Sequence, residues 1–303
     1  MTAAVYESSP IKRKRRGFDA IATVRDALYD VLSAEHPMTV RQVFYRLVSA
    51  GAIEKTEAEY KSTVCRLLGR MRREGVVPFG WIADSTRWMR KPCTFSTLES
   101  ALELTAQTYR RAMWDNQPVY VEVWLEKDAL AGVLMDETEK WDVPLMVTRG
   151  YPSLSYLYSA AEQITAIEKP AYLYYFGDYD PSGVDITRAV ESGIREFAPD
   201  AEIYFERVAV TPAQIRQYGL LTRPTKKTDS RSKNFEGESV EVDAIPPAML
   251  RQMARECIEQ HIDEDALERL HLAEQSERES MQIIADAWRD GRLRYVPEEI
   301  GES

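Results

Sequence analysis

The chain has 303 residues, enough for two ordinary domains, and its 44% apolar and 29% charged residues are typical of a globular protein. No apolar run approaches the roughly 18 residues that a membrane-spanning helix needs, and the N-terminus lacks a signal-peptide pattern, so we expect a cytoplasmic protein without a membrane partner. The net charge is −10, but residues 11–91 hold 17 Lys or Arg against 9 Asp or Glu, which leaves +8 there and −18 on the rest. A basic region on an acidic body predicts contact with a polyanion.

The first part of the chain reads as an arm followed by three helices. Residues 1–17 are predicted to be a disordered basic arm, because they include the run Lys12-Arg-Lys-Arg-Arg16. Helical spacing of apolar residues predicts a helix over 18–33. Capping boxes that begin at Thr39 and Thr56 predict two more helices, which end near residues 51 and 75. Residues 76–82 are expected to form a short wing.

The third of these helices carries a basic face. Arg66, Arg70 and Arg73 stand in one line at i, i+4 and i+7, opposite the apolar face of the helix. Three helices followed by a wing are the element order of a winged helix-turn-helix. We therefore predict that residues 18–95 form a DNA-binding domain in which these three arginines contact DNA. A connecting helix is expected over 96–118.

From residue 119 onward, predicted strands alternate with predicted helices. The strands are expected over 119–125, 143–148, 171–176 and 201–210. This alternation predicts an α/β fold with a mostly parallel sheet over residues 119–262, followed by a C-terminal helical extension over 263–303. A polar loop is expected over 223–239, and residues 240–243 are expected to form a short strand.

Three carboxylates follow two of the predicted strands. Glu126 comes directly after the first strand, and Asp178 and Asp180 come after the strand over 171–176. The carboxyl ends of strands in open α/β sheets are where ligands bind. Ligands that are all oxygen, without His or Cys, suit Mg²⁺ or Mn²⁺ and hence phosphate chemistry. Asp180 also has an alternative interpretation, as the N-cap of a helix that begins at Pro181.

These residues match a known family. Glu126-Lys127 after the first strand, Gly150-Tyr151-Pro152 after the second and Asp178-x-Asp180-Pro-x-Gly183 after the third resemble a Toprim domain. With a winged helix before it, the chain resembles the family of the topoisomerase VI A subunit and the meiotic double-strand-break transesterase over about residues 18–260.

The resemblance implies a Rossmann-like fold in which Asp178 and Asp180 hold Mg²⁺. It implies that Glu126 assists metal binding and acid–base work on the leaving 3′ oxygen, and that Lys127 faces a phosphate. It further implies a homodimer on double-stranded DNA, with the tyrosine of one subunit facing the metal of the other. Since the chain has no Gly-rich ATP-binding motif, any ATPase partner would be a separate protein.

The same family attacks DNA with a tyrosine in a segment that resembles Arg-x-x-Tyr-Tyr. In this chain Arg41-Gln-Val-Phe44-Tyr45 aligns Tyr45 with that nucleophile. A helical wheel places Tyr45 roughly 130° from the middle of the apolar face. Arg41 lies one turn before it. We therefore expect Tyr45 to be exposed beside a guanidinium group, which would help to activate a phenol whose free pKa is near 10.

The interpretation that we favour from the resemblance is a Mg²⁺-dependent DNA-breaking protein in which Tyr45 attacks a backbone phosphate and forms a 5′-phosphotyrosyl link. Two other interpretations stay open. The first is a hydrolytic Toprim nuclease, similar to those of bacterial defence systems, in which water attacks the phosphate and Tyr45 only packs. The second is a DNA-binding subunit of a larger complex that has no catalytic activity of its own.

Overall fold

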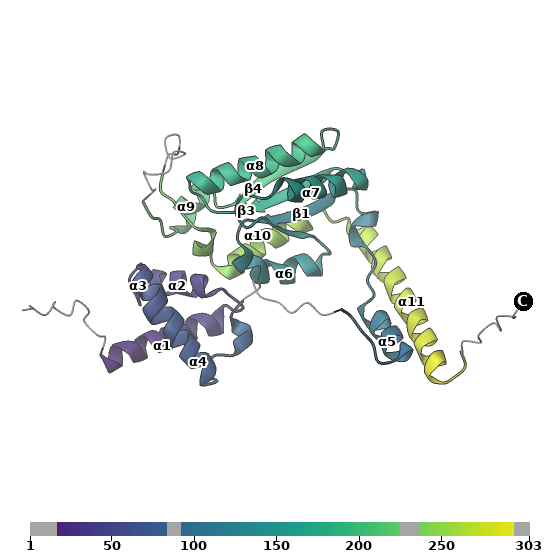
Figure 1. The fold of residues 1–303 in the computed structure, drawn as a ribbon, viewed down its shortest axis with the longest axis horizontal. Coiled ribbons are helices and arrows are strands. Elements are labelled where there is room, and N and C mark those ends of the chain that lie inside the picture. Colours follow the sequence, from purple (N-terminus) through teal and green to yellow (C-terminus); the bar gives the residue numbers. More distant parts are fainter. Residues whose placement is uncertain (1–16, 84–91, 225–234, 236, 294–303) are drawn as a thin grey trace, which may run out of the picture. The chain divides into compact units, whose positions relative to one another are not determined.

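The computed structural model describes residues 17–83, 92–224, 235 and 237–293. The chain divides into two compact units, Met1–Ala83 and Asp84–Ser303 (Figure 1). The basic arm predicted over 1–17 lies outside the described residues except for Gly17, as do most of the polar loop predicted over 223–239 and residues 294–303. None of the helices in the described ranges has the length and apolar character needed to cross a membrane.

Over residues 17–83, the described part of the first unit, three long helical segments confirm the three predicted helices. Helix α1 spans Phe18–Ala34 and α2 spans Val40–Ser49. The third segment runs without a break through α3 (Glu57–Glu59), a π-helical turn (Tyr60–Cys65) and α4 (Arg66–Arg73). The side chains of Thr39 and Gln42 form the predicted capping box at the start of α2. The Thr56 side chain accepts a hydrogen bond from the Glu59 N–H at the start of α3.

The apolar faces of these helices form the core of the first unit. The fully or almost fully buried side chains include Leu28, Leu32, Val43, Leu47, Val64, Leu68 and Met71. Gly51 and Gly75, with φ of +70° and +73°, stop the second and third segments in the left-handed conformation that glycine adopts without strain.

Residues 76–82 do not form a hairpin, so the predicted wing is reduced to a single bridge. A 3₁₀ turn spans Phe79–Trp81, and Ile82 then pairs in parallel with Met38. The Met38 N–H donates to the Trp81 carbonyl, and the Ala83 N–H donates to the Met38 carbonyl. Pro78 has no N–H for a strand ladder, and the segment after it runs past Met38 instead of folding back on itself.

The second unit contains a four-stranded parallel sheet, which confirms the predicted α/β architecture. The strands are β1 (Tyr120–Leu125), β2 (Leu145–Val147), β3 (Ala171–Phe176) and β4 (Ile203–Ala209), in the order β2-β1-β3-β4. The two central strands, β1 and β3, are buried along nearly their whole length. Continuous apolar strands of this kind are expected where helices cover both faces of a parallel sheet.

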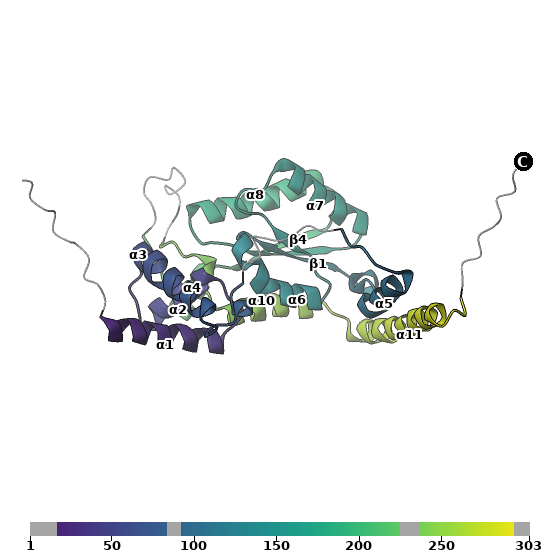
Figure 2. The same ribbon diagram turned by 60° about the horizontal axis from the view of Figure 1, so that its bottom comes forward.

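Helices cover the two faces of this sheet. Helices α7 (Leu154–Ile167) and α8 (Pro181–Phe197) lie on one face, and α6 (Ala131–Lys140) and α10 (Pro247–Glu259) lie on the other (Figures 1 and 2). Helix α9 spans Pro212–Tyr218 and follows β4. The layer between the sheet and α7/α8 is a continuous apolar core that includes Trp124, Leu157, Ile164, Leu173, Tyr175, Ile186, Val190 and Ile194.

Two further helices pack on each other. Helix α5 (Leu98–Thr108) is shorter than the predicted connecting helix over 96–118, and it packs along the long helix α11 (Glu264–Arg289), as both views show (Figures 1 and 2). Helix α5 ends because the chain becomes extended at Tyr109. The Tyr109 hydroxyl there donates to Glu277, and its carbonyl accepts from Arg278.

Candidate active site at the carboxyl edge of the sheet

Glu126, Asp178 and Asp180 lie together where the two central strands end. The chain passes from β1 to β2 on one side and from β3 to β4 on the other, so the strand order reverses between β1 and β3. Ligands of doubly wound sheets bind at this switch point. The Glu126 N–H donates to the carbonyl of Phe176, the last residue of β3, at 2.9 Å, which extends the ladder by one residue beyond β1. The sheet itself therefore brings the three predicted carboxylates to one edge.

Glu126 is tied directly to the turn after β3. Its Oε2 accepts a hydrogen bond of 3.0 Å from the backbone N–H of Asp178. Gly177 makes this approach possible, because a Cβ at that position would lie 2.6 Å from Glu126 Oε2. Burial, and then the nearby charge of Asp178, raise the pKa of Glu126 to about 7. Both protonation states of Glu126 are thus available near neutral pH, which suits a group that transfers protons.

Asp178 is buried, with 7% of its surface exposed, and its two oxygens have different environments. Oδ1 accepts a hydrogen bond of 2.8 Å from the Val242 N–H and lies 3.0 Å from the ammonium of Lys127. Burial raises the pKa of Asp178, and Lys127 and the Val242 N–H oppose that shift. Among the described residues, Oδ2 of Asp178 and Oε1 of Glu126 have no hydrogen-bond or ion-pair partner.

Asp180 caps helix α8, as its alternative interpretation predicted. Its Oδ1 accepts a hydrogen bond of 2.8 Å from the Gly183 N–H, and Pro181 stands at the first helical position. Its other oxygen, Oδ2, faces the guanidinium of Arg223 at 3.7 Å. Gly183 cannot carry a side chain here, since a Cβ would lie 2.1 Å from the Asp178 carbonyl oxygen. Asp180 therefore shapes the turn and also lies at the edge of the site.

The Lys127 ammonium points into a group of carboxylates. Its Nζ lies 2.7 Å from Asp243 Oδ2, 3.0 Å from Asp178 Oδ1 and 3.5 Å from Glu241 Oε2. Burial alone would lower the pKa of Lys127, but these three carboxylates raise it above its ordinary value. The structure therefore places Lys127 as a cation that neutralises the site, whereas the resemblance implied that it faces a phosphate.

Glu241 and Asp243 are site residues that the sequence analysis missed. Val240 pairs in antiparallel fashion with Tyr179, and a 3₁₀ turn over Val242–Ala244 follows, so this segment borders the turn after β3. Glu241 also pairs with Arg223, with 2.5 Å between Oε1 and Nη1. The signal in the sequence was the alternation Val-Glu-Val-Asp, which predicted a short strand but gave no indication of which strand it would pair with.

Arg207 on β4 is a further site residue that the sequence analysis missed. Its half-buried guanidinium donates to the carbonyls of Gly177 (3.2 Å), Gly183 (3.2 Å) and Val210 (3.0 Å), and also to the Asp178 carbonyl and the Thr187 hydroxyl. Burial lowers the pKa of Arg207. One guanidinium thus holds both ends of the turn that carries Asp178 and Asp180. The pattern in the sequence that could have identified Arg207 is a single arginine within a largely apolar strand.

Tyr45 lies in the first unit and is not exposed as expected. Only 4% of its surface is accessible, its ring packs on Phe44, and the Lys55 ammonium lies 5.4 Å from the ring centroid. The helical wheel failed because α2 is covered on two sides, by α1 and by the π-helical turn. Arg41 lies instead over the Tyr60 ring, at 4.9 Å from its centroid, and pairs with Glu57.

Arg66, Arg70 and Arg73 are exposed along α4, in the line that the sequence predicted. None of the three makes an ion pair or a side-chain hydrogen bond with another residue in the described part of the chain. Their guanidinium groups are therefore available to a polyanion.

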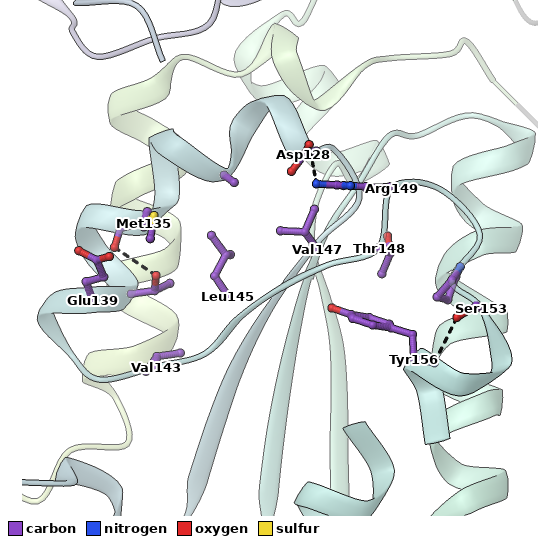
Figure 3. A pocket seen from close by; sticks show the side chains of 13 residues that line it. Asp128, Met135, Glu139, Val143, Leu145, Val147, Thr148, Arg149, Ser153 and Tyr156 are labelled. Atoms are coloured by element: carbon purple, nitrogen blue, oxygen red, sulfur yellow. Dashed lines mark hydrogen bonds and ion pairs between the residues drawn. The ribbon is translucent and has the colours of Figure 1, made fainter. Parts of the chain in front are cut away.

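A separate pocket of about 700 Å³ lies along the edge strand β2, between α6 and α7 (Figure 3). Leu145 and Val147 line it, and Tyr156 enters it from α7. Arg149 pairs with Asp128 at one end, with 3.1 Å between Nη2 and Oδ2. None of the residues predicted to bind metal lines this pocket, so it is distinct from the acidic site.

The donor atoms at the acidic site suit a partly hydrated ion. Over the ranges that the structure describes, no three His, Cys, Asp or Glu side chains are arranged so that they could hold a metal ion. Mg²⁺, however, commonly takes only one or two protein carboxylates and completes its shell with water and substrate phosphate. Oε1 of Glu126 and Oδ2 of Asp178, which have no partner among the described residues, are oxygens of that kind.

Comparison with protein-family models and with curated proteins found no match to this chain.

Proposed function

We propose that this protein breaks DNA strands by hydrolysis in a reaction that depends on Mg²⁺ or Mn²⁺, as a Toprim nuclease would. The observation that carries the proposal is the meeting of Glu126, Asp178 and Asp180 at the switch point of the sheet. Glu126 and Asp178 would hold the ion, with Asp180 at its edge. The ion, when bound, offsets negative charge on the phosphate and favours attack by water.

The residues of the chain do the remaining work. As the resemblance implies, Glu126 would hold the ion and assist proton transfer to the leaving 3′ oxygen, with its Oε2 fixed by the hydrogen bond from the Asp178 N–H. Arg207 fixes the backbone around Asp178 by its hydrogen bonds to the Gly177 and Gly183 carbonyls, which keeps the carboxylates in place before substrate arrives. Arg66, Arg70 and Arg73 would bind the DNA backbone.

Transesterification by Tyr45 is the second candidate, and one observation favours it. The Lys55 ammonium, 5.4 Å from the ring centroid of Tyr45, would stabilise a phenolate. Because only 4% of Tyr45 is exposed, the first unit would have to open for the hydroxyl to reach a phosphate. This cost is the reason why we place hydrolysis first. A homodimer and a separate ATPase partner belong to this second candidate.

The test is incubation of the full chain with end-labelled double-stranded DNA and Mg²⁺ or Mn²⁺, followed by denaturation. We expect free cut ends with the parent and with Tyr45→Phe, and none with Asp178→Asn. Asp200→Asn, which changes an exposed carboxylate between α8 and β4, is the matched control and should cut normally.

Two other outcomes would overturn hydrolysis. Label that migrates with the protein and disappears in Tyr45→Phe would establish the transesterase. DNA binding without cutting, with either ion, would indicate a DNA-binding subunit that has no activity of its own.

A further inference from the structure

Lys127 occupies the centre of a group that we call the acidic cluster: Glu126, Asp178, Asp180, Glu241 and Asp243. Its ammonium contacts three of these five carboxylates, at 2.7, 3.0 and 3.5 Å. Only 24% of the Lys127 side chain is exposed. The Lys127 ammonium is a compact positive charge among carboxylate oxygens, as a metal ion is in a site with oxygen ligands.

Lys127 and Arg223 contact carboxylates of the acidic cluster on the side of Glu241 and Asp243. Lys127 lies against Asp178, Glu241 and Asp243, and Arg223 contacts Glu241 and Asp180. Among the described residues, no cationic side chain contacts Oε1 of Glu126 or Oδ2 of Asp178.

Asp178 is the boundary between the two cation positions. One of its oxygens, Oδ1, is engaged by Lys127 and by the Val242 N–H. The other, Oδ2, has no partner among the described residues, and neither has Oε1 of Glu126. The Lys127 side of Asp178 is therefore filled by the chain itself, and the Glu126 side is left for an ion from solution.

We propose that Lys127 is a built-in cation that fills the second cation position of the acidic cluster, so that the site takes one divalent ion and not two. The proposal rests on the metal site of the proposed function and adds the number of ions and the reason for it. It assigns a pair of carboxylates, Glu241 and Asp243, to holding Lys127.

The first test counts ions. Isothermal titration of the full chain with Mn²⁺ should show one site, absent in Asp178→Asn. Lys127→Met removes the ammonium and should bind two ions, whereas Lys127→Arg keeps the charge and should bind one. Lys140→Met changes an exposed lysine at the end of α6 and is the control for loss of a surface charge.

The outcomes separate this inference from the proposed function. Two ions in the parent, or one ion in Lys127→Met, would overturn the role of Lys127 and leave the metal site standing. No binding that depends on Asp178 would overturn the metal-dependent function and the inference with it.

Thermal unfolding supplies a readout that does not depend on activity. Without metal, Lys127→Met leaves three carboxylates facing one another, so its Tm should fall well below that of the parent. Saturating Mn²⁺ should raise the Tm of Lys127→Met more than that of the parent, because two ions then stabilise the folded state. If Lys127→Met folds only with Mn²⁺, its metal content after refolding and gel filtration gives the same count. An equal rise in Tm in both proteins would contradict the proposal.

Discussion

Glu122 and Trp124 lie two residues apart on β1 and point to the same face of the sheet, where the Trp124 indole Nε1 donates a hydrogen bond of 2.7 Å to Glu122 Oε2. The Tyr120 hydroxyl donates to Oε1 of the same carboxylate at 3.1 Å. Glu122 is completely buried, although it makes no ion pair with any described residue. Burial favours the neutral form and raises the pKa of Glu122 from 4.5 to about 7, although the hydrogen bonds from Trp124 and Tyr120 oppose this shift.

This shift predicts a stability that declines with pH. Between pH 4.5 and 7 the unfolded chain has lost the proton of Glu122 while the folded protein keeps it, so the free energy of unfolding falls as pH rises through this window. Glu122→Gln cannot ionise, and should remove about 2–3 kcal/mol of that decline. Urea unfolding of both proteins at several pH values measures the difference. Parallel pH profiles would show that Glu122 is charged in the folded protein.

Gly183→Ala should disrupt the turn that carries Asp178 and Asp180. The added Cβ would meet the Asp178 carbonyl at 2.1 Å, and backbone atoms cannot yield as the end of a side chain can. We expect a loss of about 3 kcal/mol or more in the free energy of unfolding, together with loss of Mn²⁺ binding. Gly80→Ala, where no atom lies within 4 Å of the new Cβ, is the control and should unfold as the parent does. A stable Gly183→Ala protein that binds metal would show that the turn can move.

Arg207→Met should destabilise the protein and weaken its metal site together. The change removes a charged donor from the carbonyls of Gly177, Gly183 and Val210, although Gly177 keeps the Val210 N–H and Gly183 keeps the Thr187 hydroxyl, so we expect a cost of about 1–3 kcal/mol. Arg216→Met alters an exposed arginine on α9 and should change little. Chemical denaturation followed by Mn²⁺ titration checks both effects. Full metal affinity in a weakened Arg207→Met protein would restrict Arg207 to a purely structural role.

Replacement of Arg66, Arg70 and Arg73 by Gln should weaken DNA binding and reduce its salt dependence. Each phosphate contact contributes about 0.9 to the slope of log K against log salt, so the triple variant should lose about 2–3 from that slope. Fluorescence anisotropy at several salt concentrations measures it. The matched triple variant Arg188→Gln, Arg195→Gln and Arg269→Gln changes three exposed arginines of the second unit and should leave the slope unchanged. Equal slopes in the two triple variants would show that the arginines of α4 do not contact DNA.

The parts of the fold that depend on local pattern could be predicted from the sequence. Apolar runs bounded by turn residues located β1 and β3, and their parallel pairing followed because helices separate them. Glu126 and Asp178 were found for the same reason, since both directly follow strands that end at one edge.

The rest depends on contacts between distant segments. The burial of Tyr45 results from helices on two sides of α2, whereas a helical wheel assumes one covered face. The resemblance implied that Lys127 faces a phosphate, and the sequence does not show that Glu241 and Asp243 approach it. Arg207 was missed because its partners are backbone carbonyls. Every residue has such a carbonyl, so the sequence does not show which of them an arginine will contact.

The ion pair between Lys127 and Asp243 joins residues that are 116 positions apart. A ribosome makes the chain from its N-terminus, so Glu126 and Asp178 emerge long before the residues that hold Lys127. A nascent chain that ends before residue 240 has the first half of the site and lacks the second. The acidic cluster is therefore assembled only when synthesis has almost reached α10, and a protein fragment that stops after α9 carries the recognisable motif without the complete site.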